Sequence, residues 1–129
     1  MVKTILVGPD LAYGKEVLRA LDDAKFPITA ALWLLQKERD DDWQLVIATP
    51  LYDKFGPSIS YGKLIDALSK KEPVSLFDLP VRLESARRPF IKALRKTFGR
   101  AVSVEGMRLG LRSIGGTWID DGYVYRIKP

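Results

Sequence analysis

The sequence contains no cysteine and no histidine. Without cysteine the chain has no disulfide, no thiolate nucleophile and no cysteine-based zinc site. Without histidine it lacks the side chain that most often transfers protons near neutral pH. Catalysis would have to depend on carboxylates, Lys, Tyr or Ser, with an oxygen-bound ion such as Mg²⁺ as the remaining metal option. These absences favour a non-catalytic protein, and we assign no catalytic residue, metal or cofactor.

Long hydrophobic runs are also missing. No apolar stretch approaches the roughly 18 residues of a transmembrane helix. The five residues from Thr4 to Gly8 are too few for the core of a signal peptide. We therefore expect a cytoplasmic protein with no membrane partner. The 129 residues, 47% hydrophobic and 29% charged, are typical of one globular domain with its own core.

Two apolar runs form the most informative stretch of the chain. Ile28–Leu35 and Trp43–Thr49 are rich in Ile, Val, Leu and Trp and flank the polar residues Gln36–Asp42. They predict an antiparallel hairpin over about residues 28–49, at the centre of a sheet that is covered on both faces. We interpret Asp40–Asp42 as part of a solvated hairpin loop. Adjacent carboxylates on an extended chain point in different directions and do not converge on one ion.

The spacing of apolar residues predicts one helix before this hairpin and one after it. The first runs from Asp10, a good N-cap residue, to about Ala24. The second starts at Ser58 or Ser60, after the Gly56–Pro57 break, and continues to about residue 71. Short strands are expected at residues 2–7 and 74–79.

A third helix and a β-rich end follow. The helix is capped by Ser85 and ends at Gly99, with apolar residues on one face. The residues after Gly106 alternate as in a C-terminal β-meander. In this meander we expect Met107, Leu109 and Leu111 to point inward, and Tyr123, Tyr125 and Ile127 to share a face. Turns are expected at Gly115–Gly116 and Asp121–Gly122. The predicted fold is a single α+β domain over residues 1–129, with three helices packed on a mostly antiparallel sheet.

Positive charge is concentrated in one segment. Residues 82–112 carry nine Lys or Arg and two Asp or Glu, a net +7, whereas residues 1–81 carry −2. This asymmetry predicts a non-catalytic module whose basic surface binds a polyanion such as nucleic acid, or an acidic protein. An ordinary solvated helix face remains the alternative, and no motif for reading base sequence is present. The candidate contact residues are Arg88, Lys92, Arg95, Lys96, Arg100, Arg108 and Arg112.

Three other interpretations remain open. The chain can be a scaffold or self-associating protein that uses its C-terminal strands as an interface, because a terminal strand leaves backbone groups unpaired. It can be a metal-dependent hydrolase whose carboxylates converge on an ion. Tyr123 and Tyr125 beside Trp118 can form a stacking platform for bases, although aromatic residues at strand period more often belong to a core. The candidate carboxylates are Asp53, Asp78, Asp120 and Asp121.

The blocks FPITAALWLL, DDWQLVIATPLYDKFGP and GTWIDDGYVYRI resemble a group of small uncharacterised bacterial proteins. The shared features are an alanine-tryptophan strand, a tryptophan-led second strand that ends in Thr-Pro, and an acidic-glycine-aromatic end. The resemblance implies one compact domain. It implies no activity, cofactor or residue role.

Overall fold

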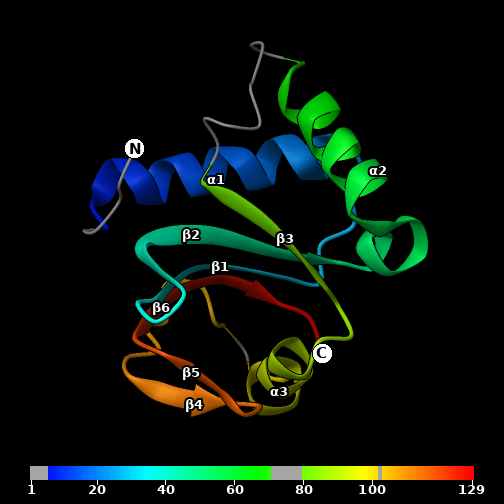
Figure 1. The fold of residues 1–129 in the computed structure, drawn as a ribbon. Helices are drawn as coiled ribbons and strands as arrows, with labels where there is room; N and C mark the ends of the chain where they lie inside the picture. The colour runs from blue at the N-terminus through cyan, green and yellow to red at the C-terminus, as the bar shows by residue number, and fades with distance from the viewer. Residues whose placement is uncertain (1–5, 71–79, 102) are drawn as a thin grey trace.

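The computed structural model describes residues 6–70, 80–101 and 103–129, with only the backbone given at Asp40 and Asp41. A four-stranded sheet has the order β3-β2-β1-β6, and β4 and β5 form a separate two-stranded sheet. Among the described strands only β2 and β3 pair in parallel. The predicted α+β fold around the β1–β2 hairpin is confirmed. In chain order the elements are α1 (Gly8–Asp23), β1 (Ala30–Gln36), β2 (Asp40–Thr49), α2 (Pro50–Leu68), β3 (Val81–Ser85), α3 (Pro89–Phe98), β4 (Arg112–Ile114), β5 (Thr117–Ile119) and β6 (Asp121–Ile127) (Figure 1).

The central hairpin is longer than the apolar runs that predicted it. Its register extends from Ala30 opposite Ala48 to Gln36 opposite Asp40. The connection is therefore a short turn, and residues 40–42 belong to the start of β2 rather than to the predicted loop. Backbone hydrogen bonds at an exposed strand end need no apolar side chains. The apolar pattern therefore did not reveal that the strands continue into the polar residues.

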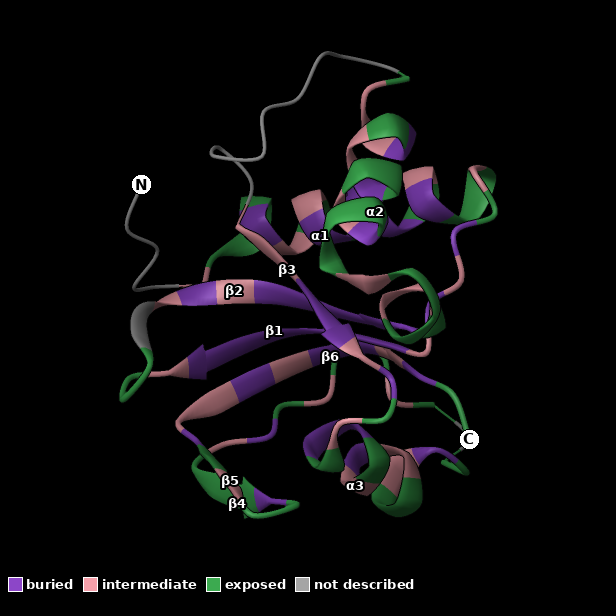
Figure 2. Cartoon of the chain, turned by 45° about the vertical axis from the view of Figure 1, so that its right-hand side comes forward, coloured by how far each residue is buried: buried purple, intermediate pink, exposed green. Residues whose placement is uncertain are grey.

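Alternation along β1 divides the core into two layers. Ala31, Trp33 and Leu35 face α1 and α2, whereas Leu32 and Leu34 face α3 and the β4–β5 hairpin. Figure 1 shows α1 and α2 on one side of the sheet and α3 with β4–β5 on the other. The central strands are buried along most of their length (Figure 2). The expectation that the sheet is covered on both faces is confirmed.

Capping explains where the first two helices begin. The Val7 N–H donates to Asp10 Oδ2 at 2.9 Å, so Asp10 caps α1 from inside the first turn rather than from its predicted N-cap position. Helix α2 begins at Pro50, where Thr49 Oγ1 accepts from the Leu51 N–H, and crosses a kink at Gly56 with φ 81°. The predicted break at Gly56–Pro57 is confirmed as this kink, and a helical segment follows it. The helix nevertheless begins at Pro50 and not at Ser58 or Ser60, because a first helical segment precedes the kink.

Helix α2 also creates the parallel strand pair, since parallel neighbours require a crossover connection. Strand β3 pairs with β2 from Val81 opposite Leu45 to Ser85 opposite Thr49. At its outer edge the Leu83 N–H donates to the Tyr61 hydroxyl at 3.0 Å. The strand predicted at residues 74–79 and most of that predicted at 2–7 lie outside the described residues.

The segment before β4 is not the alternating strand that the sequence predicted. Positive φ angles of 85° at Gly106 and 67° at Gly110 interrupt the extended backbone and leave an isolated bridge between Arg108 and Tyr123. Leu109 is buried as expected, but Leu111 is 64% exposed.

The two predicted C-terminal turns have different outcomes. Gly115 and Gly116 connect β4 and β5 with φ angles of 57° and 80°, so that turn is confirmed. Asp121 and Gly122 instead open β6, which pairs with β1. The predicted turn there was wrong because the chain already reverses at Asp120.

A bulge in β6 changes the direction of its side chains. The register shifts between Ala31 and Leu32 of β1, so one extra residue of β6 lies opposite this step. Tyr123 and Tyr125 therefore pack in the core under α1 and α2, whereas Ile127 packs in the core next to α3. The prediction that these three residues share one face was wrong for Ile127.

A buried hydrogen-bond relay joins β1, β6 and α1. The Trp33 indole N–H donates to the Tyr125 hydroxyl at 3.0 Å, and that hydroxyl donates to the Leu11 carbonyl at 2.7 Å. Gly14 lies against the same hydroxyl, and a Cβ at this position would overlap it. Burial raises the pKa of Tyr125 to about 12.

This relay predicts a loss of stability at high pH. Tyr125 keeps its proton in the folded state up to about pH 12, whereas an unfolded tyrosine loses it near pH 10. The contribution of neutral Tyr125 to the free energy of unfolding is complete below about pH 10. Above that pH it falls by about 1.4 kcal/mol per pH unit until the folded pKa is reached. Urea unfolding of the wild type and Tyr125→Phe between about pH 8 and 11.5, a range that covers the start and most of this fall, measures the difference in the free energy of unfolding. Parallel pH profiles for the two proteins would contradict this assignment.

Candidate functional site

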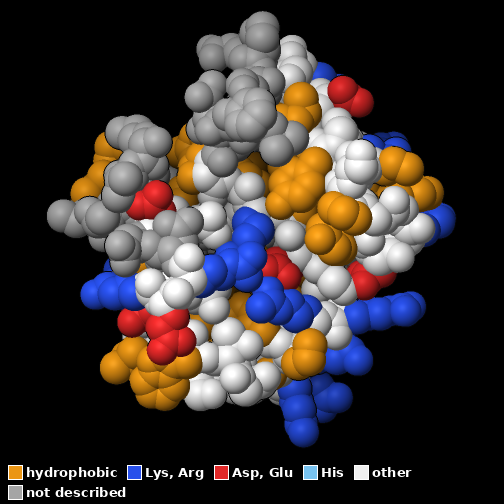
Figure 3. All heavy atoms as spheres, viewed as in Figure 1, with side chains coloured by type: hydrophobic (Ala, Val, Ile, Leu, Met, Phe, Trp, Pro, Cys, Tyr) orange, Lys and Arg blue, Asp and Glu red, His pale blue; other side chains and the backbone are white. Residues whose placement is uncertain are grey.

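Helix α3 carries the centre of the predicted basic surface. It begins at Pro89 and not directly after Ser85, because residues 86–88 form a turn and the proline fixes the first helical position. Phe90, Ile91 and Leu94 are buried against the sheet, which confirms most of the predicted apolar stripe. The basic side chains of this helix therefore lie on its outer side, and Figure 3 shows Lys and Arg gathered over this part of the molecule.

A shallow hollow of about 510 Å³ opens beside α3. No Asp or Glu is among the described residues that line it. Arg95 forms one wall by donating to the Lys128 carbonyl at 3.3 Å and to a Pro129 oxygen at 2.8 Å. The other basic side chains of the hollow make no hydrogen bond or ion pair with any described residue. We call this the α3 hollow; its lining residues are Lys92, Arg95, Lys96, Arg100 and Pro129.

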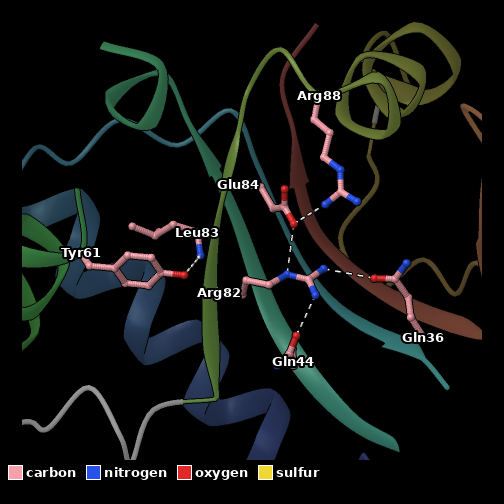
Figure 4. Close-up of polar contacts among 7 residues, drawn as sticks. All are labelled: Gln36, Gln44, Tyr61, Arg82, Leu83, Glu84 and Arg88. Atoms are coloured by element: carbon pink, nitrogen blue, oxygen red, sulfur yellow. Dashed lines mark hydrogen bonds and ion pairs between the residues drawn. The ribbon is translucent and has the colours of Figure 1, made fainter. Parts of the chain in front are cut away.

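Arg88 belongs to a different group. It lies just before α3, and its guanidinium pairs with Glu84 of β3. Glu84 also lies 3.1 Å from Arg82 Nε, without the alignment of a hydrogen bond. Arg82 donates to Gln44 Oε1 at 2.9 Å and to Gln36 Oε1 at 3.1 Å (Figure 4). Two arginines thus share one buried carboxylate on the α3 side of the sheet.

Burial dominates the electrostatics of this group. The side chains of Arg82 and Glu84 are 13% and 11% exposed. Burial lowers the pKa of Arg82 from its ordinary value, and the neighbouring Glu84 carboxylate opposes that shift. Only a weak sequence signal points to this group: Arg82 and Glu84 alternate with Val81 and Leu83, as polar residues on one strand face do. No such signal points to the two glutamines.

Arg108 is also paired. Its guanidinium binds Asp121 and lies 5.6 Å from the centroid of the Trp43 ring. The hydrogen bond with Asp121 raises the pKa of Arg108. Burial raises the pKa of Asp121, but hydrogen bonds from Arg108 and from the N–H groups of Gly122 and Gly110 outweigh it and hold that pKa low. Arg112, at the start of β4, is exposed and has no partner among the described side chains.

The structure therefore sorts the seven predicted contact residues into two sets. Arg88 and Arg108 are compensated by carboxylates, and Arg95 by carbonyl oxygens at the end of β6. The remaining four carry charge without a described partner. These are Lys92, Lys96, Arg100 and Arg112, three of which line the α3 hollow.

The candidate carboxylates are occupied by local hydrogen bonds. Asp53 accepts from the Ser85 hydroxyl and from the Ala86 N–H. Asp120 accepts from the Lys37 N–H at 2.7 Å. Asp121 accepts from the Arg108 guanidinium and from the N–H groups of Gly110 and Gly122. Among the described residues no three acidic side chains are grouped as a metal site requires, and Asp78 lies outside them. The geometry therefore gives the hydrolase interpretation no support.

The aromatic residues do not form the platform that their spacing suggested. Tyr123 and Tyr125 pack edge-to-face, with ring centroids 5.4 Å apart, in the core under α1 and α2. Trp118 lies on β5 in the opposite layer and is 51% exposed. Both tyrosines lie on the face of the sheet that α1 and α2 cover, and β5 lies on the opposite face, so Trp118 is separated from them.

The outer edge of β6 is partly occupied by its own chain. Val124 donates to the Met107 carbonyl and accepts from the Gly106 N–H, at 2.9 and 2.8 Å. The Leu109 N–H donates to the Gly122 carbonyl at 2.9 Å. The interface predicted at the C-terminal strands stays a prediction, but this part of the edge is already paired.

A second hollow, of about 330 Å³, lies between the end of α1 and α2. Its floor is apolar, and a carboxylate stands among its lysines. The residues that carry charge there are Lys25, Lys63, Asp66 and Lys70. It is therefore smaller and more balanced in charge than the α3 hollow.

Comparison with protein-family models, curated proteins and solved structures found no match for this chain. The resemblance to small bacterial proteins accordingly stays a prediction. None of the helices in the described ranges combines the length and apolarity needed to cross a membrane. Fold and site together define a small α+β fold with a hollow beside α3 that is lined by four basic residues and by no described Asp or Glu.

Proposed function

We propose that this protein is a non-catalytic module that binds nucleic acid through the α3 hollow. One observation carries the proposal: Lys92, Lys96 and Arg100 converge on a hollow that no described Asp or Glu side chain lines, and their own side chains have no described partner. Elsewhere on the chain the basic side chains of Arg82, Arg88, Arg108 and Arg126 are paired with acidic groups. A fold that balances many of its arginines and leaves this cluster open has a surface suited to an external anion.

The geometry suits a chain of phosphates better than a single small anion. The hollow is shallow, and its cations are spread along the helix and beyond its end, with Lys92 and Lys96 one turn apart. Lys and Arg set along one face contact successive phosphates without any sequence motif. Reducing conditions also suit a fold without disulfides, and we include cytoplasmic location in the proposal.

The first test is fluorescence anisotropy with labelled oligonucleotides over a range of salt concentrations. With three cations on the phosphates, the logarithm of the binding constant should fall with the logarithm of salt with a slope of about −2 for a single strand. The triple variant Lys92→Glu, Lys96→Glu, Arg100→Glu should lose measurable binding. Unchanged binding by this variant would refute the assigned surface.

The matched control places the same change in charge at the second hollow. Lys25→Glu, Lys63→Glu, Lys70→Glu has the same net charge as the first triple variant, but its mutations lie between α1 and α2. This control should retain most of the affinity of the wild type. Equal loss in both triple variants would mean that net charge, and not the α3 hollow, determines binding.

A further inference from the structure

Trp118 differs from the other two tryptophans of the chain. Trp33 and Trp43 are 0% and 4% exposed, whereas Trp118 is 51% exposed. Its ring makes no aromatic contact and its indole N–H no hydrogen bond with another described residue. An indole has a large apolar surface, and leaving half of it in water forgoes the stabilisation that burial supplies.

The β4–β5 hairpin holds this ring outward. Ile114 and Ile119 anchor the hairpin to the core next to α3, so the alternate residues point away from the sheet. Trp118 is opposite Ser113, whose small side chain leaves the indole uncovered. The tight Gly115–Gly116 turn fixes the two strands in this register.

The hairpin also joins this ring to the layer that carries the α3 hollow. At Gly115 an added Cβ would come within 2.6 Å of the Pro89 carbonyl oxygen and 3.0 Å of the Ala93 side chain, so the turn lies directly on the first turns of α3. Lys92 and Lys96 flank Ala93 along the same helix. Figure 1 shows α3 and the β4–β5 hairpin on one side of the main sheet.

Figure 3 shows exposed hydrophobic side chains at the lower left, at the level of the β4–β5 hairpin, and basic side chains at the lower right, on the side of α3. A flat aromatic surface and a group of unpaired cations on the same side of the main sheet together match one type of polymer: bases that are free to stack, joined by phosphates. A duplex presents phosphates but keeps its base faces inside the stack. The surface of another protein could bury the Trp118 ring, but it offers no regular series of anions for the lysines.

We propose that Trp118 is a stacking platform for an unpaired base, so that the ligand is single-stranded nucleic acid. This inference rests on the proposed function of the α3 hollow and adds to it the class of nucleic acid. The phosphates contact Lys92, Lys96 and Arg100, and one base lies on the indole. Affinity then has a salt-dependent part from the hollow and a salt-independent part from the ring.

The test compares three labelled ligands of roughly 12 nucleotides, a length within the usual range of single-strand sites. They are a single strand, an abasic strand of equal charge, and a duplex of the same sequence. The wild type should bind the single strand about 5- to 150-fold more tightly than the abasic strand, since stacking contributes about 1–3 kcal/mol per base. Trp118→Ala should remove that difference without changing the salt slope, and Trp118→Phe should restore part of it.

Each other outcome has a separate meaning. If Trp118→Ala binds the single strand as the wild type does, while the charge-reversed α3 triple variant does not, the stacking proposal is overturned and the hollow retains its function. The exposed ring would then belong to a protein contact. If the wild type binds none of the three ligands at low salt, the proposed function itself fails. Circular dichroism and thermal unfolding check that Trp118→Ala is folded, as expected for an exposed residue.

Discussion

Glu84→Ala is expected to lower the free energy of unfolding by about 3 kcal/mol and to raise the affinity for a polyanion. The carboxylate of Glu84 lies between the guanidinium groups of Arg82 and Arg88. Its removal leaves Arg82, whose side chain is 13% exposed, with two glutamine oxygens as its only described side-chain partners. Removing one partner of a buried pair commonly costs about 3–5 kcal/mol, and the partial exposure of Arg88 places this case at the lower end.

The rise in affinity has a separate cause. Arg88 immediately precedes α3, and without Glu84 its charge is free to act beside the α3 hollow. Stability and affinity thus change in opposite directions, which a variant that simply damages the fold would not produce. Urea unfolding followed by circular dichroism gives the first quantity, and oligonucleotide anisotropy the second.

Glu105→Ala provides the control for this variant. Glu105 pairs with Lys15 at the surface, where the two side chains are 60% and 58% exposed. Loss of an exposed pair should change stability by less than about 1 kcal/mol. A Glu84 variant as stable as this control would show that the carboxylate does not hold the two arginines.

Trp33→Ala is expected to have the largest effect on stability, a loss of about 3–5 kcal/mol. Trp33 is completely buried at the centre of the sheet, and its ring packs against Tyr13 with centroids 6.5 Å apart. The substitution creates a cavity in the core under α1 and α2 and removes the donor to Tyr125. Because small domains are stable by only about 5–15 kcal/mol, a large fraction of the variant would unfold in mild denaturant.

Trp33→Phe separates the two contributions. It retains most of the ring volume but lacks the N–H group, so its loss should be closer to that of one buried hydrogen bond, about 1–2 kcal/mol. Urea midpoints of the wild type and the two variants provide the comparison. Near-equal stability of wild type and Trp33→Ala would be incompatible with a packed residue at this position.

The elements that were predicted well are those in which the local pattern of apolar residues indicates which side chains are buried. The β1–β2 hairpin was visible because Leu32, Trp33 and Ile47 belong to runs that only a covered strand tolerates. The buried stripe of α3 was visible because its apolar residues recur at helical spacing. In both cases local pattern and tertiary contact agree.

The features that were missed depend either on residues distant in sequence or on residue types that occur in both loops and helices. The bulge at Tyr125 is set by pairing with β1, and without it Ile127 was assigned to the wrong face. The start of α2 was missed because Pro50 and Gly56 look like loop residues, although one can begin a helix and the other can kink it.

The candidate site was predicted only in part for the same reason. Net charge located the basic segment, but whether an arginine is free depends on which acidic residue the fold brings to it. Arg88 meets Glu84 four residues earlier in the chain, and Arg108 meets Asp121 thirteen residues later. No count of charges distinguishes these arginines from Lys92 or Arg100, because pairing is a property of the folded surface.

The hydrogen bonds at the two borders of the main sheet affect how this chain behaves at high concentration. On one border the Tyr61 hydroxyl takes the N–H of Leu83, and on the other residues 106–109 pair with β6. An incoming strand would have to break these bonds before forming its own, which raises the barrier to strand-by-strand growth. One tyrosine and one short segment thus occupy backbone groups at the two borders of the sheet that a strand of another copy would otherwise use.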